Sequence, residues 1–192
     1  MDLTHSLSIA PTLLAPATFY SATAIAADPK LVPDEPGIYG WWFDDATLNV
    51  PDQDSIAVGS RRLLYLGIAP SAPSRSGAAS KRTLRDRLKN HTRGPIATST
   101  LRRTLTSLLG GQLGFGVVRL PSGKLAMSRD DEQRLTGWMT DHARVAWMVH
   151  PRPWEIESAL IVGGPRLPLN IRESADPFRA ELQAMRRRLG LQ

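Results

Sequence analysis

The stretch Pro36-Gly37-Ile38-Tyr39-Gly40-Trp41-Trp42-Phe43 decides how this chain folds. It is β-branched and aromatic after a Pro-Gly start, a composition typical of a strand. Leu63-Leu64-Tyr65-Leu66-Gly67-Ile68 reads as a second, almost wholly apolar strand. The acidic, turn-rich segment 44–60 separates them, so we expect the two strands to pair as a hairpin with a long loop.

The segments that follow this hairpin define the fold class. Helix start and stop signals predict helices over about 83–91, from Thr98 or Ser99 to a stop at Gly110-Gly111, over 128–142 and 154–162, and from 174 onward. Residues 144–150 alternate as a third strand. This order predicts an α+β domain, a small, mostly antiparallel three-stranded sheet flanked by helices, with an extra helical insertion at about 110–143 and a C-terminal helix.

Length and composition set the broad class. The 192 residues fit one domain, and the absence of cysteine excludes disulfides, thiolate metal sites and cysteine nucleophiles. No apolar stretch approaches the roughly 20 residues of a membrane helix, so we expect no membrane partner. Residues 1–5 carry no Lys or Arg, and Pro11 and Pro16 interrupt the Ala-rich segment. We therefore expect residues 1–34 to be a leader that packs on the domain or frays from it, in a cytoplasmic protein.

Positive charge is concentrated in one segment. The chain carries a net charge of +6, while residues 75–103 hold nine basic residues and one acid, a net +8 that leaves −2 for the rest. A localised basic field predicts a phosphate-rich partner. A solvated basic surface is the alternative.

Several common catalytic motifs are missing from the sequence. It contains no Gly-x-x-x-x-Gly-Lys-Ser/Thr loop, dinucleotide fingerprint, Gly-x-Ser-x-Gly elbow or His-Glu-x-x-His pair. His142 and His150 lie apart from any acidic ligand pattern, and we interpret them as ordinary surface or helix-end histidines.

Two predicted helices carry polar side chains beside their apolar faces. On a helical wheel Arg87 and His91 border the stripe formed by Leu84 and Leu88. Glu157 falls in the middle of the apolar face of helix 154–162. A buried carboxylate needs a compensating cation, which a structural salt bridge, a metal or an arginine in a catalytic pocket could supply.

The two strands also place two of the three tyrosines in similar settings, Gly37-Ile38-Tyr39 and Tyr65-Leu66-Gly67. Core packing alone can explain a strand tyrosine. These segments, however, resemble the two half-motifs of the GIY-YIG nuclease family. Helix 84–91 resembles the basic helix of that family, with Arg87 and His91 at its arginine and histidine. Glu157 and the segment Pro168-Leu169-Asn170 resemble its last helix and tail.

The resemblance runs in order from about Pro36 to Asn170, with three departures. Leu66 stands where the second half-motif has isoleucine, and the loop between the half-motifs is long. The region from Gly110 to Val149 is longer than a minimal domain of this family, which suggests an added helix or hairpin. None of the departures removes a position that the family uses for catalysis.

The resemblance implies an endonuclease that hydrolyses phosphodiester bonds. Glu157 would hold one Mg²⁺, a hard ion that binds through few carboxylates, and Mn²⁺ would substitute for it. Tyr39 would act as general base or orient the water, and Arg87 would favour its phenolate or bind the phosphate. His91 and Tyr65 would relay a proton or position the phosphate. Asn170 would brace the site or a phosphate. Whether Tyr39 or His91 takes the proton stays open.

The basic segment then supplies contacts to a DNA backbone, which position a duplex without reading its sequence. RNA ranks lower as a partner because the chain has no recognised single-strand-binding aromatic pattern. The predicted nucleic-acid contacts are Lys81, Arg82, Arg85, Lys89, Arg93, Arg102 and Arg103.

The C-terminal run Arg186-Arg187-Arg188 either extends this basic track or complements the dipole of its helix. We assign residues 35–172 to the nuclease-like domain and 173–192 to a basic C-terminal helix. A non-cleaving nucleic-acid-binding module of the same fold is the alternative function, and a dimer would allow both strands to be cut.

Overall fold

The computed structural model describes residues 11–73, 80–172, 174 and 176–191. Arg75 and residues 74–79 of the predicted connector 69–80 lie outside the described residues, as do residues 1–10 of the leader. Its helices and strands are α2 (Pro11–Leu14), α3 (Ala22–Ala27), a 3₁₀ turn (Pro29–Leu31), β1 (Gly37–Asp44), β2 (Ala57–Val58), β3 (Arg61–Ala69), α4 (Leu84–Arg93), a 3₁₀ turn (Ile96–Thr98), α5 (Thr100–Leu113), β4 (Val117–Arg119), β5 (Leu125–Met127), α6 (Arg129–His142), β6 (Ala143–Val149), α7 (Pro153–Gly163) and α8 (Phe178–Arg188).

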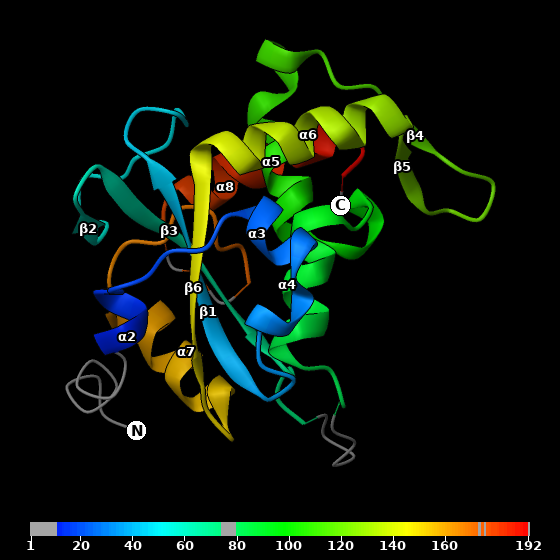
Figure 1. The fold of residues 1–192 in the computed structure, drawn as a ribbon. Coiled ribbons are helices and arrows are strands. Elements are labelled where there is room, and N and C mark those ends of the chain that lie inside the picture. Colours follow the sequence, from blue (N-terminus) through cyan, green and yellow to red (C-terminus); the bar gives the residue numbers. More distant parts are fainter. Residues whose placement is uncertain (1–10, 74–79, 173, 175, 192) are drawn as a thin grey trace.

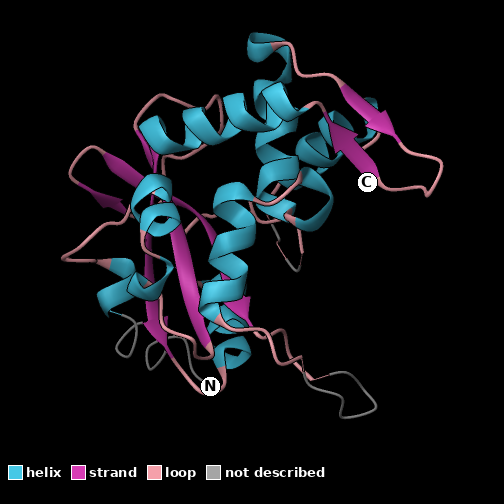
Figure 2. Cartoon of the chain, turned by 45° about the vertical axis from the view of Figure 1, so that its right-hand side comes forward, coloured by secondary structure: helices cyan, strands magenta, loops and turns pink. Residues whose placement is uncertain are grey.

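The central sheet has the order β2-β3-β1-β6, and every pair in it is antiparallel (Figures 1 and 2). The three predicted strands are therefore confirmed, and the two-residue β2 adds a fourth at the edge. β1 lies between β3 and β6, which explains why its residues 37–43 are all buried. A strand buried on both faces reads as a continuous apolar run, as this one does.

Tyr39 and Tyr65 lie on one face of the sheet because Tyr39 pairs with Gly67, two residues after Tyr65, and a β-bulge in β3 then places Leu64 on that face as well. Trp41 lies opposite Tyr65, but Trp42 lies opposite Leu63, so Leu64 is the extra residue. Such an extra residue reverses the alternation of side chains beyond it. Leu64 and Tyr65 accordingly pack in the same core cluster as Tyr39, whereas Leu63 and Leu66 pack on the other side.

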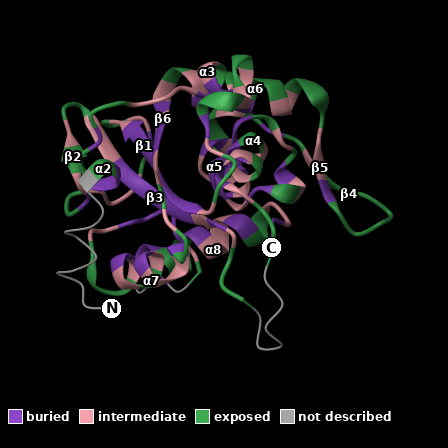
Figure 3. Ribbon diagram, turned by 60° about the horizontal axis from the view of Figure 1, so that its bottom comes forward, coloured by how far each residue is buried: buried purple, intermediate pink, exposed green. Residues whose placement is uncertain are grey.

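Helices cover both faces of the sheet (Figure 3). α4 packs on the face of β1 and β3 that carries Tyr39, with α5 and α6 behind it, and α2 and α7 pack on the opposite face. The capping box of α4 fixes its start, because Thr83 and Asp86 each bond the backbone N–H of the other. The sheet therefore presents Tyr39 to the helix that carries Arg87 and His91.

The described part of the N-terminal segment packs on the domain. Leu13 and Ile25 are buried, and Tyr20 forms a β-bridge with Val145 on the outer edge of β6. This bridge covers part of an edge that would otherwise expose unpaired backbone groups. In the described part of the chain, no helix has the length and apolar character to cross a membrane.

Two predicted boundaries were wrong. α5 continues through Gly110-Gly111 and ends at Gly114, whose left-handed φ of 62° terminates the helix. Glycine inside a helix costs only about 1 kcal/mol, which packing offsets. The insertion is also not purely helical, since β4 and β5 form a hairpin before α6. The C-terminal helix begins at Phe178, later than expected.

Candidate active site

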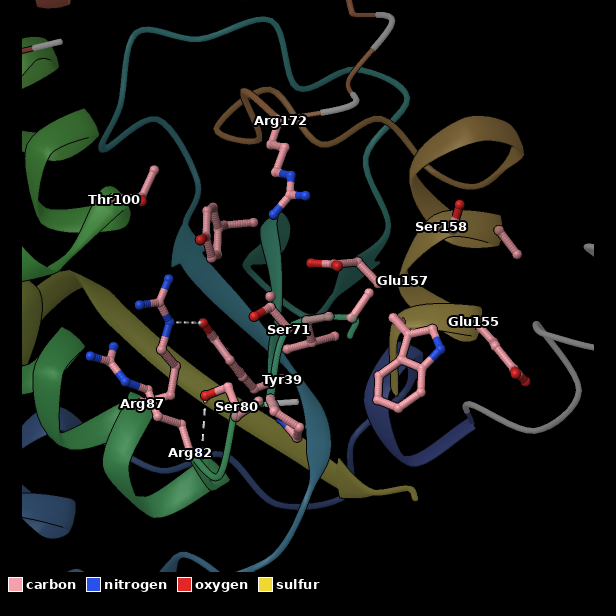
Figure 4. A pocket seen from close by; sticks show the side chains of 18 of the residues that line it. Tyr39, Ser71, Ser80, Arg82, Arg87, Thr100, Glu155, Glu157, Ser158 and Arg172 are labelled. Atoms are coloured by element: carbon pink, nitrogen blue, oxygen red, sulfur yellow. Dashed lines mark hydrogen bonds between the residues drawn. The ribbon is translucent and has the colours of Figure 1, made fainter. Parts of the chain in front are cut away.

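A pocket of about 870 Å³ opens beside the sheet where the two predicted half-motifs meet. β1 and β3 supply Tyr39 and Tyr65 to its wall, α4 supplies Arg87, and α7 supplies Glu157 (Figure 4). Four of the six predicted catalytic residues therefore line one cavity. The outermost two, Tyr39 and Glu157, lie 118 residues apart in the sequence.

The hydroxyl of Tyr39 is the centre of a buried hydrogen-bond network. Its Oη lies 2.7 Å from His91 Nε2 and accepts a hydrogen bond from Arg87 Nε at 3.2 Å. Arg87 and His91 stand one helical turn apart on α4, so both reach the same phenol. Tyr65 lies close by, with ring centroids 6.5 Å from Tyr39 and 6.0 Å from His91.

Burial controls the protonation of this network. It raises the pKa of Tyr39 well above its usual value, and the nearby Tyr65 adds to the increase while Arg87 opposes it. Burial also raises the pKa of Tyr65. The pKa of His91 falls well below its usual value because of burial and the charges of Arg87 and Arg102. His91 is therefore a neutral imidazole at physiological pH.

His91 does not reach the surface. Its side chain is completely buried, and its two ring nitrogens face Tyr39 and Ser99. This corrects the expectation that His91 acts directly on a phosphate. Its position behind Tyr39 allows it to act only through that phenol.

Gly67 leaves the space that the Tyr39 hydroxyl occupies. A Cβ at Gly67 would overlap Tyr39 Oη and lie 2.6 Å from Tyr39 Cζ. Both groups belong to paired strands, since Gly67 lies directly opposite Tyr39. The glycine of the second half-motif is therefore required by the tyrosine of the first.

We expect Gly67→Ala to displace the Tyr39 ring and to reduce any activity of this site by about 10²-fold, because such losses accompany shifts of roughly 1 Å. Thermal unfolding together with a cleavage assay measures the effect. Gly111→Ala is the matched control, since a Cβ there meets nothing within 4 Å in α5. Equal activities of the two variants would contradict the argument.

Glu157 borders the buried stripe of α7 rather than occupying its centre. Pro153, Ile156 and Leu160 are buried, and Glu157 is half-buried. Figure 4 shows its carboxylate extending into the pocket, while Glu155 on the same helix points away. Within the described part of the chain, no group of three or more His, Asp or Glu residues could hold a metal together. A metal in this pocket would thus depend on one carboxylate.

Asn170 pairs with the exposed edge of β3. Its Oδ1 accepts from the Leu66 N–H and its Nδ2 donates to the Leu66 carbonyl, both at 2.9 Å. The side chain thereby replaces the peptide group of a neighbouring strand. Of the two predicted roles, this contact supports bracing of the site, because the amide is buried against β3.

The predicted nucleic-acid contacts differ in how far they are exposed. Arg82 lines the pocket, and Lys81, Lys89 and Arg93 are exposed. Arg103 is partly buried near Arg87 and Tyr65, and burial followed by the charge of Arg87 lowers its pKa.

Arg102 is a correction to the predicted set, whereas Arg85 is partly exposed and engaged in an ion pair at the surface. Arg85 binds Asp34 at 3.3 Å and the Val32 carbonyl at 3.0 Å. Arg102 is fully buried and binds Glu132 at 2.7 Å, which joins α5 to α6. Its charge is thus satisfied inside the fold and does not face a nucleic acid.

The three arginines of the C-terminal run, Arg186 to Arg188, also lie in different environments. Arg186 is buried and donates to the Leu191 carbonyl at 2.9 Å, and burial lowers its pKa to about 10. Arg187 and Arg188 are exposed. Only these last two can extend a basic surface.

The pocket includes residues that the sequence analysis did not single out. Arg172 points into it from the segment after Asn170, and Thr100 and Trp154 line it from α5 and α7 (Figure 4). Arg172 stands two residues after a predicted site residue, which was the available signal. Ser99, expected only as a helix cap, contacts His91 Nδ1 at 2.7 Å.

Comparison with known proteins identifies one family. The family model described as "GIY-YIG catalytic domain" matches residues 37–188, which cover most of the chain and all of the pocket's predicted catalytic residues. No curated protein and no solved structure gives a significant match.

Proposed function

The chain belongs to the GIY-YIG catalytic domain family, whose members are generally endonucleases, and from this premise we propose that it is a divalent-metal-dependent DNA endonuclease. The observation that carries the proposal is the Tyr39 hydroxyl, which contacts both Arg87 and His91 in a pocket that Glu157 also lines. A phenol, a guanidinium and a carboxylate around one cavity supply the parts that phosphodiester hydrolysis requires.

In this proposal Tyr39 acts on the attacking water. Its deprotonated oxygen takes a proton from the water, whose oxygen forms a bond to phosphorus. The bond from phosphorus to the leaving oxygen breaks, and that oxygen receives a proton from solvent. Arg87 holds the Tyr39 oxygen and bears the positive charge that stabilises a phosphoryl group as negative charge develops on it. Tyr65 positions the phosphate from the neighbouring strand.

The residues present fit a hard divalent cation. A carboxylate oxygen such as that of Glu157 is the donor that Mg²⁺ prefers, and Mg²⁺ commonly binds through one carboxylate and several waters. Nucleases of this family commonly use divalent metals. When bound, Mg²⁺ or Mn²⁺ would neutralise charge on the phosphate and the leaving oxygen. Glu157 is the residue that we assign to hold it.

Exposed basic residues of the predicted set would bind the DNA backbone. We assign this role to Arg82 in the pocket and to Lys81, Lys89 and Arg93 outside it, with Arg103 beside the site. Such contacts make affinity depend strongly on salt concentration.

Cleavage of supercoiled plasmid tests the proposed function. We expect purified protein to nick or linearise the plasmid in the presence of Mg²⁺ or Mn²⁺. Cleavage should stop when EDTA removes the metal and resume when Mg²⁺ is restored. Cleavage that continues unchanged in EDTA would contradict metal dependence. Salt-sensitive DNA binding without cleavage under any of these conditions, on plasmid or on branched and nicked DNA, would favour a binding module of the same fold.

A further inference from the structure

Three buried polar side chains form a continuous line behind the pocket. Ser99 Oγ lies 2.7 Å from His91 Nδ1, and His91 Nε2 lies 2.7 Å from Tyr39 Oη. Ser99, His91 and Tyr39 are each completely buried. Because none of the three is exposed in this structure, every hydrogen in this line must be placed on a protein acceptor or, for Tyr39, directed toward the pocket that it lines.

The hydrogen on Ser99 has one available acceptor. As the N-cap of α5, Ser99 Oγ accepts the backbone N–H of Arg102 at 3.1 Å. If His91 Nδ1 also donated to Ser99, the hydroxyl would accept twice, and its own hydrogen would have no other acceptor among the described residues. The hydroxyl therefore donates to Nδ1.

This donation determines where the His91 hydrogen lies. His91 is neutral, since burial and the charges of Arg87 and Arg102 lower its pKa. A neutral imidazole carries one N–H, and Nδ1 is occupied as an acceptor. The hydrogen is consequently on Nε2, which donates to Tyr39 Oη.

We propose that Ser99 is a positioning residue that fixes His91 as the Nε2–H tautomer, so that Tyr39 Oη accepts from both His91 and Arg87 and directs its own hydrogen into the pocket. The role in cleavage rests on the proposed function, whereas the hydrogen arrangement does not. It resolves which group accepts the reaction's proton, because His91 donates to Tyr39 and has no free lone pair for it.

The arrangement gives Tyr39 a defined course in the reaction. Its hydroxyl passes a proton to a water molecule that enters the pocket with the substrate, not to His91. The resulting oxygen anion keeps two hydrogen-bond donors, and its remaining acceptor position faces the attacking water. His91 and Arg87 together stabilise that anion.

Nitrogen-15 NMR of the full-length protein labelled at histidine tests the tautomer directly. We expect His91 Nδ1 to give the chemical shift of an unprotonated ring nitrogen and Nε2 that of a protonated one, with the His91 signals assigned by their loss in His91→Asn. A protonated Nδ1 in the wild-type protein would overturn the proposal.

Substitutions at Ser99 then test the cause. Ser99→Ala should produce a mixture of tautomers and reduce kcat by about 10-fold to 100-fold with little change in KM, as for other partners that orient functional histidines. Ser99→Thr keeps the hydroxyl and should restore the single tautomer. Ser128→Ala is the matched control, because Ser128 caps α6 through the Asp131 N–H without contacting a histidine.

Each outcome bears on one proposal. An unchanged tautomer in Ser99→Ala would show that Ser99 does not determine the tautomer of His91. An equal loss of kcat in Ser128→Ala would show that the loss in Ser99→Ala comes from the missing helix cap. If the wild-type protein cleaves no DNA, the proposed function fails, while the NMR spectrum still decides the tautomer.

Discussion

Replacement of Glu157 by glutamine is expected to reduce DNA cleavage by about 10³-fold or more while DNA binding persists. Glutamine keeps the size of the side chain but removes the charge that would hold a divalent cation. Plasmid cleavage, DNA binding in EDTA and titration with Mn²⁺ measure the three effects.

Glu155→Gln is the matched control, since Glu155 also borders the pocket from the same helix but turns its carboxylate away and binds Arg152 at 3.0 Å. We expect its cleavage rate to stay within a few-fold of the wild-type rate. Exposed ion pairs of this kind contribute at most about 1 kcal/mol. Full activity of Glu157→Gln, or an equal loss in both variants, would remove Glu157 from the metal site.

Much of the fold was predictable because local signals agree with tertiary packing. The caps Thr83, Ser99 and Ser128 start helices where the sequence placed them. The bulge at Leu64 was not predictable, because residues 63–66 are all apolar or aromatic and every register satisfies the core equally. The length of the insertion suggested an added helix or hairpin, but β4 and β5 could not be placed, since strands of three residues carry almost no alternation.

The site was partly predictable for a similar reason. Tyr39, Arg87 and Glu157 stand in local patterns that place them beside a buried stripe, and the structure brings them to one pocket. Arg102 was misjudged because its partner Glu132 lies 30 residues away, and counting charge along the chain does not reveal such a pair. The contact between Ser99 and His91 depends on the turn between α4 and α5, which no periodicity specifies.

Tyr39→Phe is expected to reduce cleavage by about 10²-fold to 10⁴-fold, the usual contribution of a general base. The phenyl ring keeps the core filled, but the variant leaves His91 Nε2–H and Arg87 Nε–H without their acceptor. We expect the free energy of unfolding to fall by about 1–3 kcal/mol. Cleavage rates and chemical denaturation measure the two effects separately.

The pH dependence of the cleavage rate identifies Tyr39 as the general base more specifically than the loss of cleavage in Tyr39→Phe does. Since burial raises the pKa of Tyr39, its deprotonated fraction is small at neutral pH and rises about tenfold per pH unit. The wild-type rate should therefore increase across the neutral range with a slope of about one, and Tyr39→Phe should lose this dependence. Because the pKa of His91 is well below its usual value, no inflection is expected near pH 6.5.

Tyr65→Phe separates the base from its neighbour. Tyr65 lines the same pocket and its pKa is also raised, but the His91 nitrogens bond Tyr39 and Ser99 instead. We expect a smaller loss of about 10-fold for Tyr65→Phe, with the slope retained. If the pH dependence of the rate disappears in Tyr65→Phe and persists in Tyr39→Phe, Tyr65 is the general base and Tyr39 its neighbour. The rate would then follow the ionisation of the tyrosine on β3.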